Sequence, residues 1–402
     1  MLALEALMVL FSLISTLLAS DPVLCARDKD QIKKPGIIRI AISGNTRNRS
    51  AMEMIVPSGA YHKGSRTKLF NHIKKQSPDC VVLLGDSVPS GSKASYAKES
   101  KLWTEQLGAA GPKVELETLK VPRTRSGGLL PLVGDKEMVS DPMLLNWGST
   151  FPALGPDIGH NRVASWYSVD LVSKGVIWKA VFLNSSKVQL GSRWQEQLDW
   201  LDELLGEGSD FEGMLLFFHD GAVNLANPKS STSNPASQEL IETIESYLPM
   251  MKLNVVFFAG GYANQAILPN GTFGTLHIGA GGGGAIVQDL FISHSPGKAK
   301  TTEEKLTLEP VFTQYLLKQL RSWNSKSALP ENIYQRAYGL GSYEGFDRAF
   351  DKKHFPIKGY WELQLQGKNI NLIYHQQLPN NEFHKSYQIG LTDQEGWSSI
   401  EL

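Results

Sequence analysis

Residues 80–91, CVVLLGDSVPSG, indicate the fold class. The apolar run is continuous rather than alternating and ends in Gly-Asp and a turn, so it predicts a strand buried on both faces. The same pattern occurs in GIIRIAISG at 36–44 and LLPLVGD at 129–135, with helical spacing at 65–76 and 94–107 between the strands. This alternation of strand and helix predicts an α/β protein whose sheet is covered on both faces.

The middle of the chain adds a second set of elements. ASWYSVDLV at 164–172 and VIWKAVFLN at 176–184 are separated by Ser-Lys-Gly, which predicts a β-hairpin. SRWQEQLDWLDELLG at 192–206 has the apolar stripe of an amphipathic helix, and apolar strands follow at 213–219 and 254–260. The middle of the chain therefore differs from the regular alternation of strand and helix before it.

The C-terminal part is less regular. A polar, lysine-rich segment at 296–305 predicts a linker. Beyond it, GYWELQLQGKNINLIYH at 359–375 alternates apolar and polar residues around a Gly-Lys turn, which predicts another β-hairpin. We therefore expect a main domain over 36–295 and a C-terminal extension over 296–402.

Composition places the chain among ordinary globular proteins. It has 402 residues, of which 42% are hydrophobic and 20% are charged, so extended disorder is excluded. The 40 Lys and Arg residues are balanced by 40 Asp and Glu residues. Nucleic-acid binding is not expected, because it requires a basic face that displaces counterions.

The N-terminus predicts export. Residues 2–19 are almost wholly apolar, but the run is shorter than the ~20 residues that span a bilayer, which is typical of a signal peptide. Val23 and Cys25 suit the positions before a cleavage site. We expect a signal peptide over 1–25, a secreted or extracytoplasmic protein, and no stable membrane span after cleavage. An uncleaved membrane anchor and a lipid anchor on Cys25 are the alternatives.

The cysteine content agrees with this interpretation. Cys25 and Cys80 are the 2 cysteines of the chain, and cleavage after Cys25 leaves Cys80 alone. Because Cys80 begins an apolar strand, we expect an inert core thiol and no structural disulfide.

Polar residues that can bind metals follow several of the predicted strands. Asp86, Asp135 and His219 come directly after apolar runs, and Asn45 is a fourth candidate. Each one alone is compatible with a turn residue, a helix cap or a structural histidine. In open α/β sheets, however, functional side chains gather at the carboxyl ends of strands, so the set predicts a shared site.

The order and spacing of these motifs resemble a known family. GNTR at 44–47, GDSV at 85–88, GDKE at 134–137, His219 and GGYA at 260–263 follow the order of the five motifs of calcineurin-like metallophosphoesterases. The chain is most similar to the purple-acid-phosphatase-like branch, over roughly residues 36–295. The resemblance implies a four-layer α/β/β/α sandwich of two mixed sheets, here with a C-terminal appendage.

The resemblance also implies metal ligands. Asp86 stands at the position of the carboxylate that bridges the two metals in the family, and His219 stands at another ligand position. Asn45 replaces an aspartate and Asp135 replaces an asparagine, so both positions keep an oxygen donor.

Other family positions have lost their donors. Lys136 stands where the family has its catalytic histidine, and Gly261 and Ala263 stand where it has two ligand histidines. One metal would keep only Asn45 and Asp86, whereas the other would keep Asp86, Asp135 and His219. Two-metal hydrolysis, which needs several donors on each metal, is therefore not expected, although three donors suffice for a single metal.

Two cations offer an alternative to the metals. Arg47 and Lys136 adjoin the positions of Asp86 and Asp135 in the motifs. They would neutralise these carboxylates or bind an anion if they point into the site; otherwise they are ordinary solvated cations.

Three hypotheses follow. The first is an exported pseudo-phosphatase that has no cofactor and binds a phosphorylated or sulfated small ligand or a partner protein. The second is an active, metal-dependent phosphomonoesterase with one Fe, Zn or Mn ion at Asp86, Asp135 and His219. The third is a structural or surface-interaction protein. We lean against an enzyme, because the dinuclear ligand set is incomplete.

Overall fold

A computed structural model provides the coordinates of the chain. It describes residues 37–44, 46–47, 64–107, 128–151, 165–206, 211–220, 236, 239–240, 243, 253–259, 265–270, 275–280, 358–377, 382–392 and 396–400. Residues 1–25, and with them the predicted signal peptide, lie outside this set.

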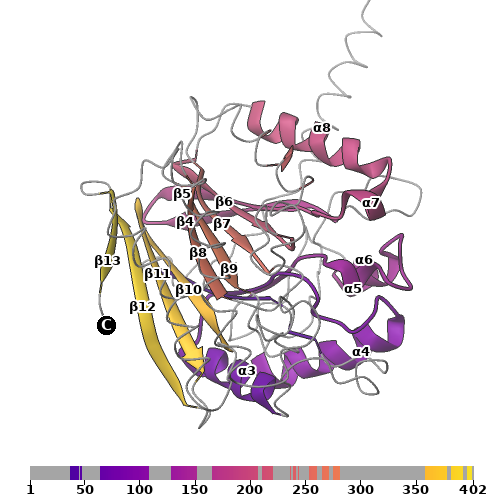
Figure 1. The fold of residues 1–402 in the computed structure, drawn as a ribbon, viewed down its shortest axis with the longest axis horizontal. Helices are drawn as coiled ribbons and strands as arrows, with labels where there is room; N and C mark the ends of the chain where they lie inside the picture. Colours follow the sequence, from indigo (N-terminus) through magenta and orange to yellow (C-terminus); the bar gives the residue numbers. More distant parts are fainter. Residues whose placement is uncertain are drawn as a thin grey trace, which may run out of the picture.

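The first of two mixed sheets has the order β13-β12-β11-β10-β1-β2-β3 (Figure 1). Its strands are β1 Ile38–Ser43, β2 Cys80–Leu83, β3 Gly128–Pro131, β10 Lys358–Gln366, β11 Asn369–Gln377, β12 Phe383–Thr392 and β13 Gly396–Ile400. β2 lies parallel to both β1 and β3, whereas β10 lies antiparallel to β1. The three strands predicted from continuous apolar runs are thus neighbours in one sheet.

The second sheet has the order β4-β5-β6-β7-β9-β8. Its strands are β4 Tyr167–Ser173, β5 Val176–Phe182, β6 Gly213–Phe218, β7 Leu253–Phe258, β8 Gln265–Asn270 and β9 Thr275–Ala280. β4 and β5 form the predicted hairpin, and β5, β6, β7 and β9 run parallel.

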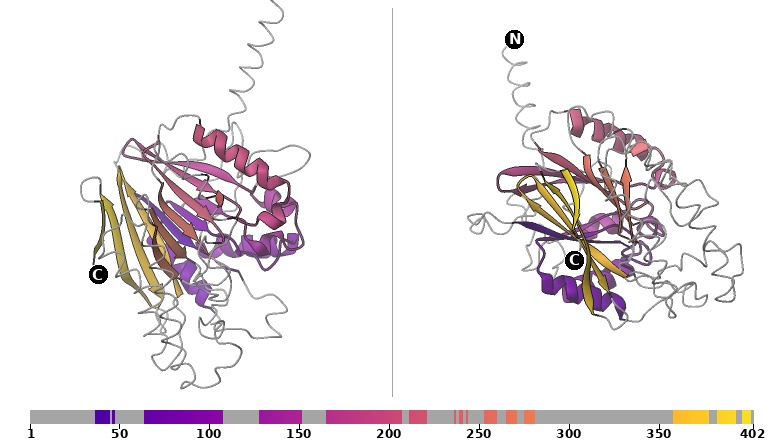
Figure 2. Two further views of the ribbon diagram at one scale, coloured as in Figure 1. Left: turned by 45° about the horizontal axis from the view of Figure 1, so that its top comes forward. Right: turned by 60° about the vertical axis from the view of Figure 1, so that its left-hand side comes forward.

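Helices cover the outer sides of the two sheets. Figures 1 and 2 show α3 and α4 on the side of the first sheet and α8 on the side of the second. The four-layer α/β/β/α sandwich is therefore confirmed. The described helices are α3 Ser65–Gln76, α4 Lys93–Leu102, the π-helix η1 Trp103–Leu107, α5 Asp135–Met138, α6 Leu145–Thr150, α7 Lys187–Leu190 and α8 Arg193–Gly206.

An aromatic ladder fills part of the space between the sheets. Tyr167, Phe182, Phe217 and Phe257 stack across β4, β5, β6 and β7, with ring centroids 4.5, 4.7 and 5.1 Å apart. The Tyr167 hydroxyl donates a hydrogen bond of 2.8 Å to the carbonyl of Pro131 in the first sheet. Offset aromatic stacking and burial together stabilise this contact between the sheets.

The expected C-terminal appendage is not confirmed. β10 and β11 form a hairpin where one was predicted, but β10 pairs with β1 inside the first sheet. The Ser173 hydroxyl donates to the Leu365 carbonyl at 2.9 Å, and Trp178 donates to the Gly367 carbonyl at 2.8 Å. Pairing with β10 satisfies the backbone groups on one side of β1, which would otherwise form an open edge.

A buried polar network fixes this hairpin to the N-terminal strands. Arg39 Nε donates to Glu362 Oε1 at 2.7 Å, and His375 Nε2 lies 2.7 Å from Glu362 Oε2. His72 of α3 stacks on Phe383 with centroids 4.1 Å apart. Burial is the main cause that lowers the pKa of His72 to about 4, so this side chain is neutral at pH 7.

The expectation of a free thiol at Cys80 is wrong. Cys80 is fully buried and forms a disulfide bond. The other of the 2 cysteines, Cys25, lies outside the described residues. Sequence reasoning took the apolar surroundings of Cys80 as a sign of an inert thiol and therefore missed the bond.

The disulfide gives the first testable prediction. In the denatured, non-reduced protein, no thiol is expected to react with a maleimide, whereas both of the 2 cysteines should react after reduction. Cys80→Ser should lower the free energy of unfolding by about 2–5 kcal/mol. Reaction of Cys80 without reductant would contradict the bond.

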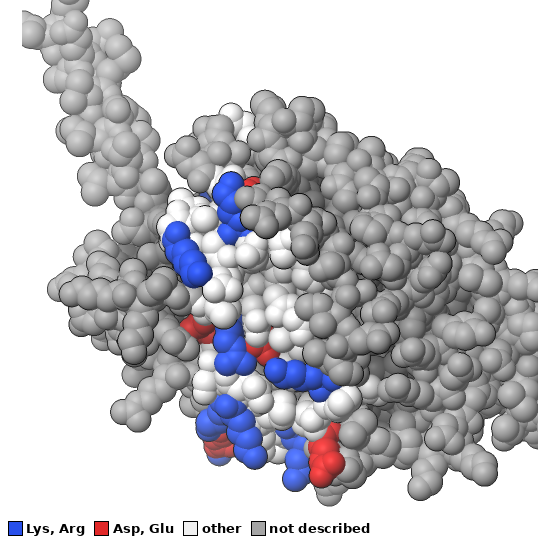
Figure 3. All heavy atoms as spheres, turned by 90° about the vertical axis from the view of Figure 1, so that its left-hand side faces the viewer, with Lys and Arg blue, Asp and Glu red and all other residues white. Residues whose placement is uncertain are grey.

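Charges on the described surface are mixed. On the face that carries the C-terminal strands, Lys and Arg side chains alternate with Asp and Glu (Figure 3). Within the residues described, no helix is both long and apolar enough to cross a bilayer.

Candidate metal and anion site

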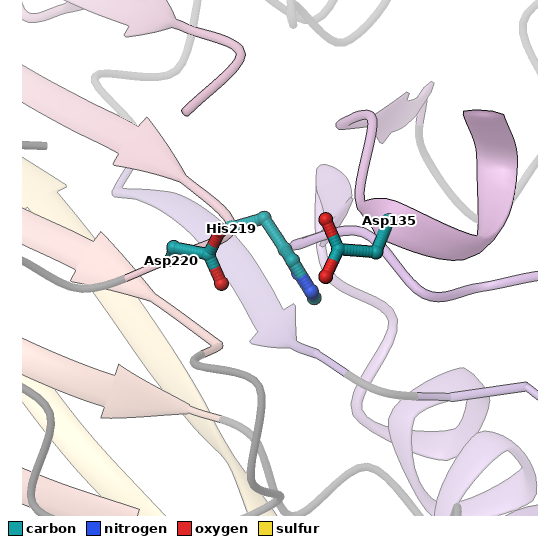
Figure 4. Close-up of side chains that lie close together, drawn as sticks. All are labelled: Asp135, His219 and Asp220. Carbon is teal, nitrogen blue, oxygen red and sulfur yellow. The ribbon is translucent and has the colours of Figure 1, made fainter. Parts of the chain in front are cut away.

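Candidate residues from both sheets meet at the carboxyl ends of three strands. Asp86 follows β2, Asp135 follows β3 as the first residue of α5, and His219 and Asp220 follow β6. Figure 4 shows the carboxylates of Asp135 and Asp220 on either side of the His219 ring. Asn45 and the fifth motif, GGYA at 260–263, lie outside the described residues.

The loop after β2 approaches its neighbours too closely for a side chain at Gly85. Gly85 has a φ of 79°, and a Cβ there would lie 2.8 Å from the Gly134 Cα and from His219 Nδ1. Asp86 also has a positive φ, of 50°. The Gly-Asp pair therefore places the Asp86 carboxylate between the loop after β3 and the end of β6.

Glu137 holds this loop in place. Its buried carboxylate accepts hydrogen bonds from the backbone N–H groups of Asp86 at 2.9 Å, Ser87 at 2.7 Å, Val88 at 3.3 Å and Gly134 at 3.0 Å. Burial and the nearby Asp86 carboxylate raise the pKa of Glu137. Sequence reasoning gave Glu137 no role; its place in GDKE, two residues after a candidate ligand, was the available signal.

His219 is almost completely buried, with 1% of its surface exposed. Its Nδ1 lies 2.7 Å from the Leu84 carbonyl, which can only accept, so Nδ1 carries a proton. Its Nε2 has no hydrogen-bond partner among the described residues and lies 3.6 Å from Asp86 Oδ1. Burial by itself lowers the pKa of His219, but Asp86, Asp220 and Asp135 raise it to about 9. The site therefore favours a positive charge at Nε2.

Arg47 lies at the other oxygen of Asp86. Its Nε is 3.6 Å from Asp86 Oδ2, and its side chain is 10% exposed. The Arg47 backbone N–H donates to the Asp86 carbonyl at 3.0 Å, and Arg66 donates to the Thr46 carbonyl at 3.0 Å. Asp86 thus has a guanidinium near one oxygen and an imidazole near the other.

Lys136 contacts Asp86 through its main chain. Its backbone N–H donates to Asp86 Oδ1 at 2.9 Å. Of the described carboxylates, none lies within ion-pair distance of the Lys136 ammonium.

Two serines after β5 orient the acidic residues. The Ser186 hydroxyl donates to Asp135 Oδ1 at 3.0 Å, and the Ser185 hydroxyl accepts the Asp220 N–H at 2.9 Å. As a result, one donor atom each of Asp135, His219 and Asp220 lies within 4.8 Å of the others. Sequence reasoning missed Asp220, although it directly follows His219.

Comparison with known proteins identifies the fold. No protein-family model and no curated protein matches the sequence. The purple acid phosphatase PPD1 from yellow lupin (Lupinus luteus) seeds superposes with a TM-score of 0.51 at 13% identity, over 89% of this chain. The chain has the purple-acid-phosphatase fold. It spans 54% of the lupin protein, about half of its length.

Two further structures are similar. PhoD matches with a TM-score of 0.50 at 12% identity, over 91% of this chain and 72% of its own. GAP50, the anchor in the inner membrane complex of Plasmodium, has a TM-score of 0.46 at 13% identity, over 87% of this chain and 88% of its own. The superpositions on the lupin phosphatase and on PhoD confirm the resemblance to the purple-acid-phosphatase-like branch at the level of the fold.

The described residues fit one metal better than two. Arg47 lies on the Oδ2 side of Asp86, whereas the side chains that could coordinate a metal lie around His219. The Arg47 guanidinium places a permanent positive charge beside Asp86 Oδ2, because a guanidinium remains charged at any physiological pH. A metal ion beside His219 could be coordinated by its imidazole and by the carboxylates of Asp135 and Asp220.

Proposed function

We propose that the protein is an exported pseudo-phosphatase, in which the purple-acid-phosphatase fold has become a binding site for an anionic ligand or partner. The observation that carries the proposal is the Arg47 guanidinium 3.6 Å from Asp86 Oδ2. In the family, this carboxylate bridges two metals, so a fixed organic cation here stands in for one of them.

The chemistry of the substitution supports binding rather than hydrolysis. Two-metal hydrolysis needs a metal that generates a hydroxide nucleophile and another that stabilises the leaving oxygen. A guanidinium neutralises charge and donates planar hydrogen bonds, but it does not coordinate and activate water. Arg47 can therefore still recognise a phosphate or sulfate group, and Lys136, whose backbone N–H donates to Asp86 Oδ1, would add positive charge.

The disulfide supports export. Disulfides persist mainly in oxidising compartments such as the secretory pathway, the periplasm and the cell exterior. The bond at Cys80 and the apolar N-terminus together favour a secreted or extracytoplasmic protein.

A phosphomonoesterase with one metal at Asp86, Asp135 and His219 is the second candidate. The observation in its favour is the buried His219 Nε2, which has no hydrogen-bond partner in the described part of the chain. Against it stands Lys136 at the position of the family's catalytic histidine, because an ordinary lysine is too weak an acid near pH 7.

Phosphate and sulfate provide the test. We expect no hydrolysis of an aryl phosphate above the buffer rate with added Zn²⁺, Mn²⁺ or Fe²⁺. Inorganic phosphate or sulfate at about 100 times Kd should stabilise the fold by about 2.7 kcal/mol. Arg47→Gln should lose this stabilisation, whereas the exposed Lys98→Ala should keep it. Stabilisation that is equal in wild type and Arg47→Gln would contradict anion binding at Arg47.

The two alternative hypotheses, an enzyme and a structural protein, predict different results in these experiments. Metal-dependent turnover that Asp86→Asn abolishes would establish the phosphomonoesterase. Absence of both turnover and anion stabilisation would leave the structural or surface-interaction role.

A further inference from the structure

The peptide group that joins Thr46 to Arg47 is held at both of its polar atoms. Its N–H, which belongs to Arg47, donates to the Asp86 carbonyl at 3.0 Å. Its carbonyl, which belongs to Thr46, accepts a hydrogen bond of 3.0 Å from Arg66 Nη1. Thr46 is fully buried, so solvent does not reach this carbonyl. Because a peptide group is planar, the two hydrogen bonds fix the plane from which the Arg47 side chain leaves the backbone.

Arg66 is itself oriented by a buried carboxylate. It is the second residue of α3, and the same Nη1 atom donates to Glu99 Oε2 at 2.7 Å. Glu99 lies in α4 and is fully buried, and Figure 1 shows α3 and α4 on the outer side of the first sheet. A chain of contacts therefore runs from Glu99 through Arg66 to the Thr46 carbonyl, directly before the residue that lies beside Asp86.

Stability alone does not explain this buried ion pair. Removing two charges from water costs about as much as their attraction returns, and well-packed apolar residues of similar volume are often equally stable. The pair also has no net charge, so it contributes little to the attraction of an anion to the site. What Arg66 provides, and an apolar residue does not, is a charged donor directed at a buried carbonyl.

We propose that Arg66, oriented by Glu99, is a positioning residue that holds the peptide group before Arg47, so that the Arg47 guanidinium faces Asp86. The inference rests on the proposed anion-binding function and adds to it two residues that lie outside the five motifs. Groups that are fixed before a ligand arrives bind it more tightly, because less conformational freedom is lost on binding. Without the Arg66 donor, the peptide group can rotate and the Arg47 side chain is no longer directed into the site.

Replacing the ion pair by apolar residues separates positioning from stability. Arg66→Met together with Glu99→Leu leaves the net charge unchanged and should keep the fold. Isothermal titration calorimetry of the full chain with inorganic phosphate should show binding about tenfold weaker than in wild type, a loss typical of outer contacts that orient a binding residue. A merely structural role predicts instead that this stable variant binds phosphate like wild type.

Two further variants are matched to this one. The exposed ion pair of Lys101 and Glu105 is replaced by two alanines, which also leaves the net charge unchanged, and this control should bind phosphate like wild type. Arg66→Lys keeps a positive charge and a donor but lacks the planar guanidinium. Its phosphate affinity should therefore lie between that of wild type and that of the apolar variant.

Hydrogen exchange of the Arg47 amide tests the positioning role without any ligand. In wild type this N–H is bonded to the Asp86 carbonyl, so it should exchange slowly. In the apolar variant it should exchange at least about tenfold faster. The Leu84 amide, which donates to the Ser43 carbonyl at 3.0 Å, should exchange as in wild type. Circular dichroism and thermal unfolding show whether each variant folds.

Two outcomes would overturn the positioning role. Either the Arg47 amide exchanges as slowly in the folded apolar variant as in wild type, or that variant binds phosphate as tightly as a wild type that does bind it. Failure of the proposed function is a different result: wild type binds no phosphate, or Arg47→Gln binds it like wild type. Amide exchange then still decides the role of Arg66, because it needs no ligand.

Discussion

Replacing Glu137 by alanine is expected to lower the free energy of unfolding by roughly 3–5 kcal/mol. Glu137 is fully buried, and its carboxylate accepts N–H groups from both the Asp86 loop and Gly134. Alanine would leave these donors buried without acceptors, and each orphaned donor costs about 1–3 kcal/mol. Since the Glu137 carboxylate sets the conformation of the Asp86 loop, anion binding should fall together with stability.

Urea unfolding at pH 7 measures this loss. The exposed Glu203→Ala on α8 is the control and should change stability by less than about 0.5 kcal/mol. Glu137→Gln keeps one oxygen acceptor, so its stability should lie between that of Glu137→Ala and that of Glu203→Ala. A loss below about 1 kcal/mol in Glu137→Ala would show that solvent or relaxation satisfies the loop and that Glu137 does not organise it.

The second large effect is expected at the junction of the C-terminal hairpin. Glu362→Ala should lower the free energy of unfolding by roughly 3 kcal/mol, because removing one member of a buried charged pair leaves the other without its counter-charge. Arg39 and His375 both contact the Glu362 carboxylate at 2.7 Å. The Arg39 side chain is 29% exposed. Water therefore solvates the guanidinium in the Glu362→Ala variant and offsets part of the lost interaction.

The pH dependence gives a sharper test of this network. Burial by itself raises the pKa of Glu362, but hydrogen bonds from His375 and Arg39 lower it to about 2, from an ordinary value of 4.5. The ionised network therefore stabilises the fold above pH 4.5, and this contribution is lost as the pH falls through 2. In Glu362→Gln, the stability difference from wild type should be constant above pH 5 and should shrink toward pH 2. A difference that does not change with pH would exclude the charge as its cause.

Local sequence patterns predicted the central strands. The runs at 36–44, 80–86 and 129–135 are mostly apolar because β1, β2 and β3 are buried on both faces. β8 was not predicted, because QAILPN contains Pro269 and too few apolar residues for a clear pattern. Proline is tolerated there because β8 is an edge strand.

Local sequence patterns could not predict which distant strands pair with one another. Arg39 and Glu362 are 323 positions apart in the chain but in contact in the fold. Nothing in the alternation of 359–375 indicates which strand the hairpin joins, so a separate extension was the natural expectation. The same limit applies to Cys80, because a local apolar pattern does not show that a cysteine is disulfide-bonded.

The sequence by itself determined which residues stand at the ends of the strands: Asp86, Asp135 and His219, each after an apolar run. Only the tertiary structure decided how they are used. It places Arg47 at one oxygen of Asp86 and brings Asp220 into the group around His219. The reason is physical: side-chain chemistry and strand pattern are local, whereas a binding site is set by distances of a few ångströms between elements that the chain connects only by packing two sheets together.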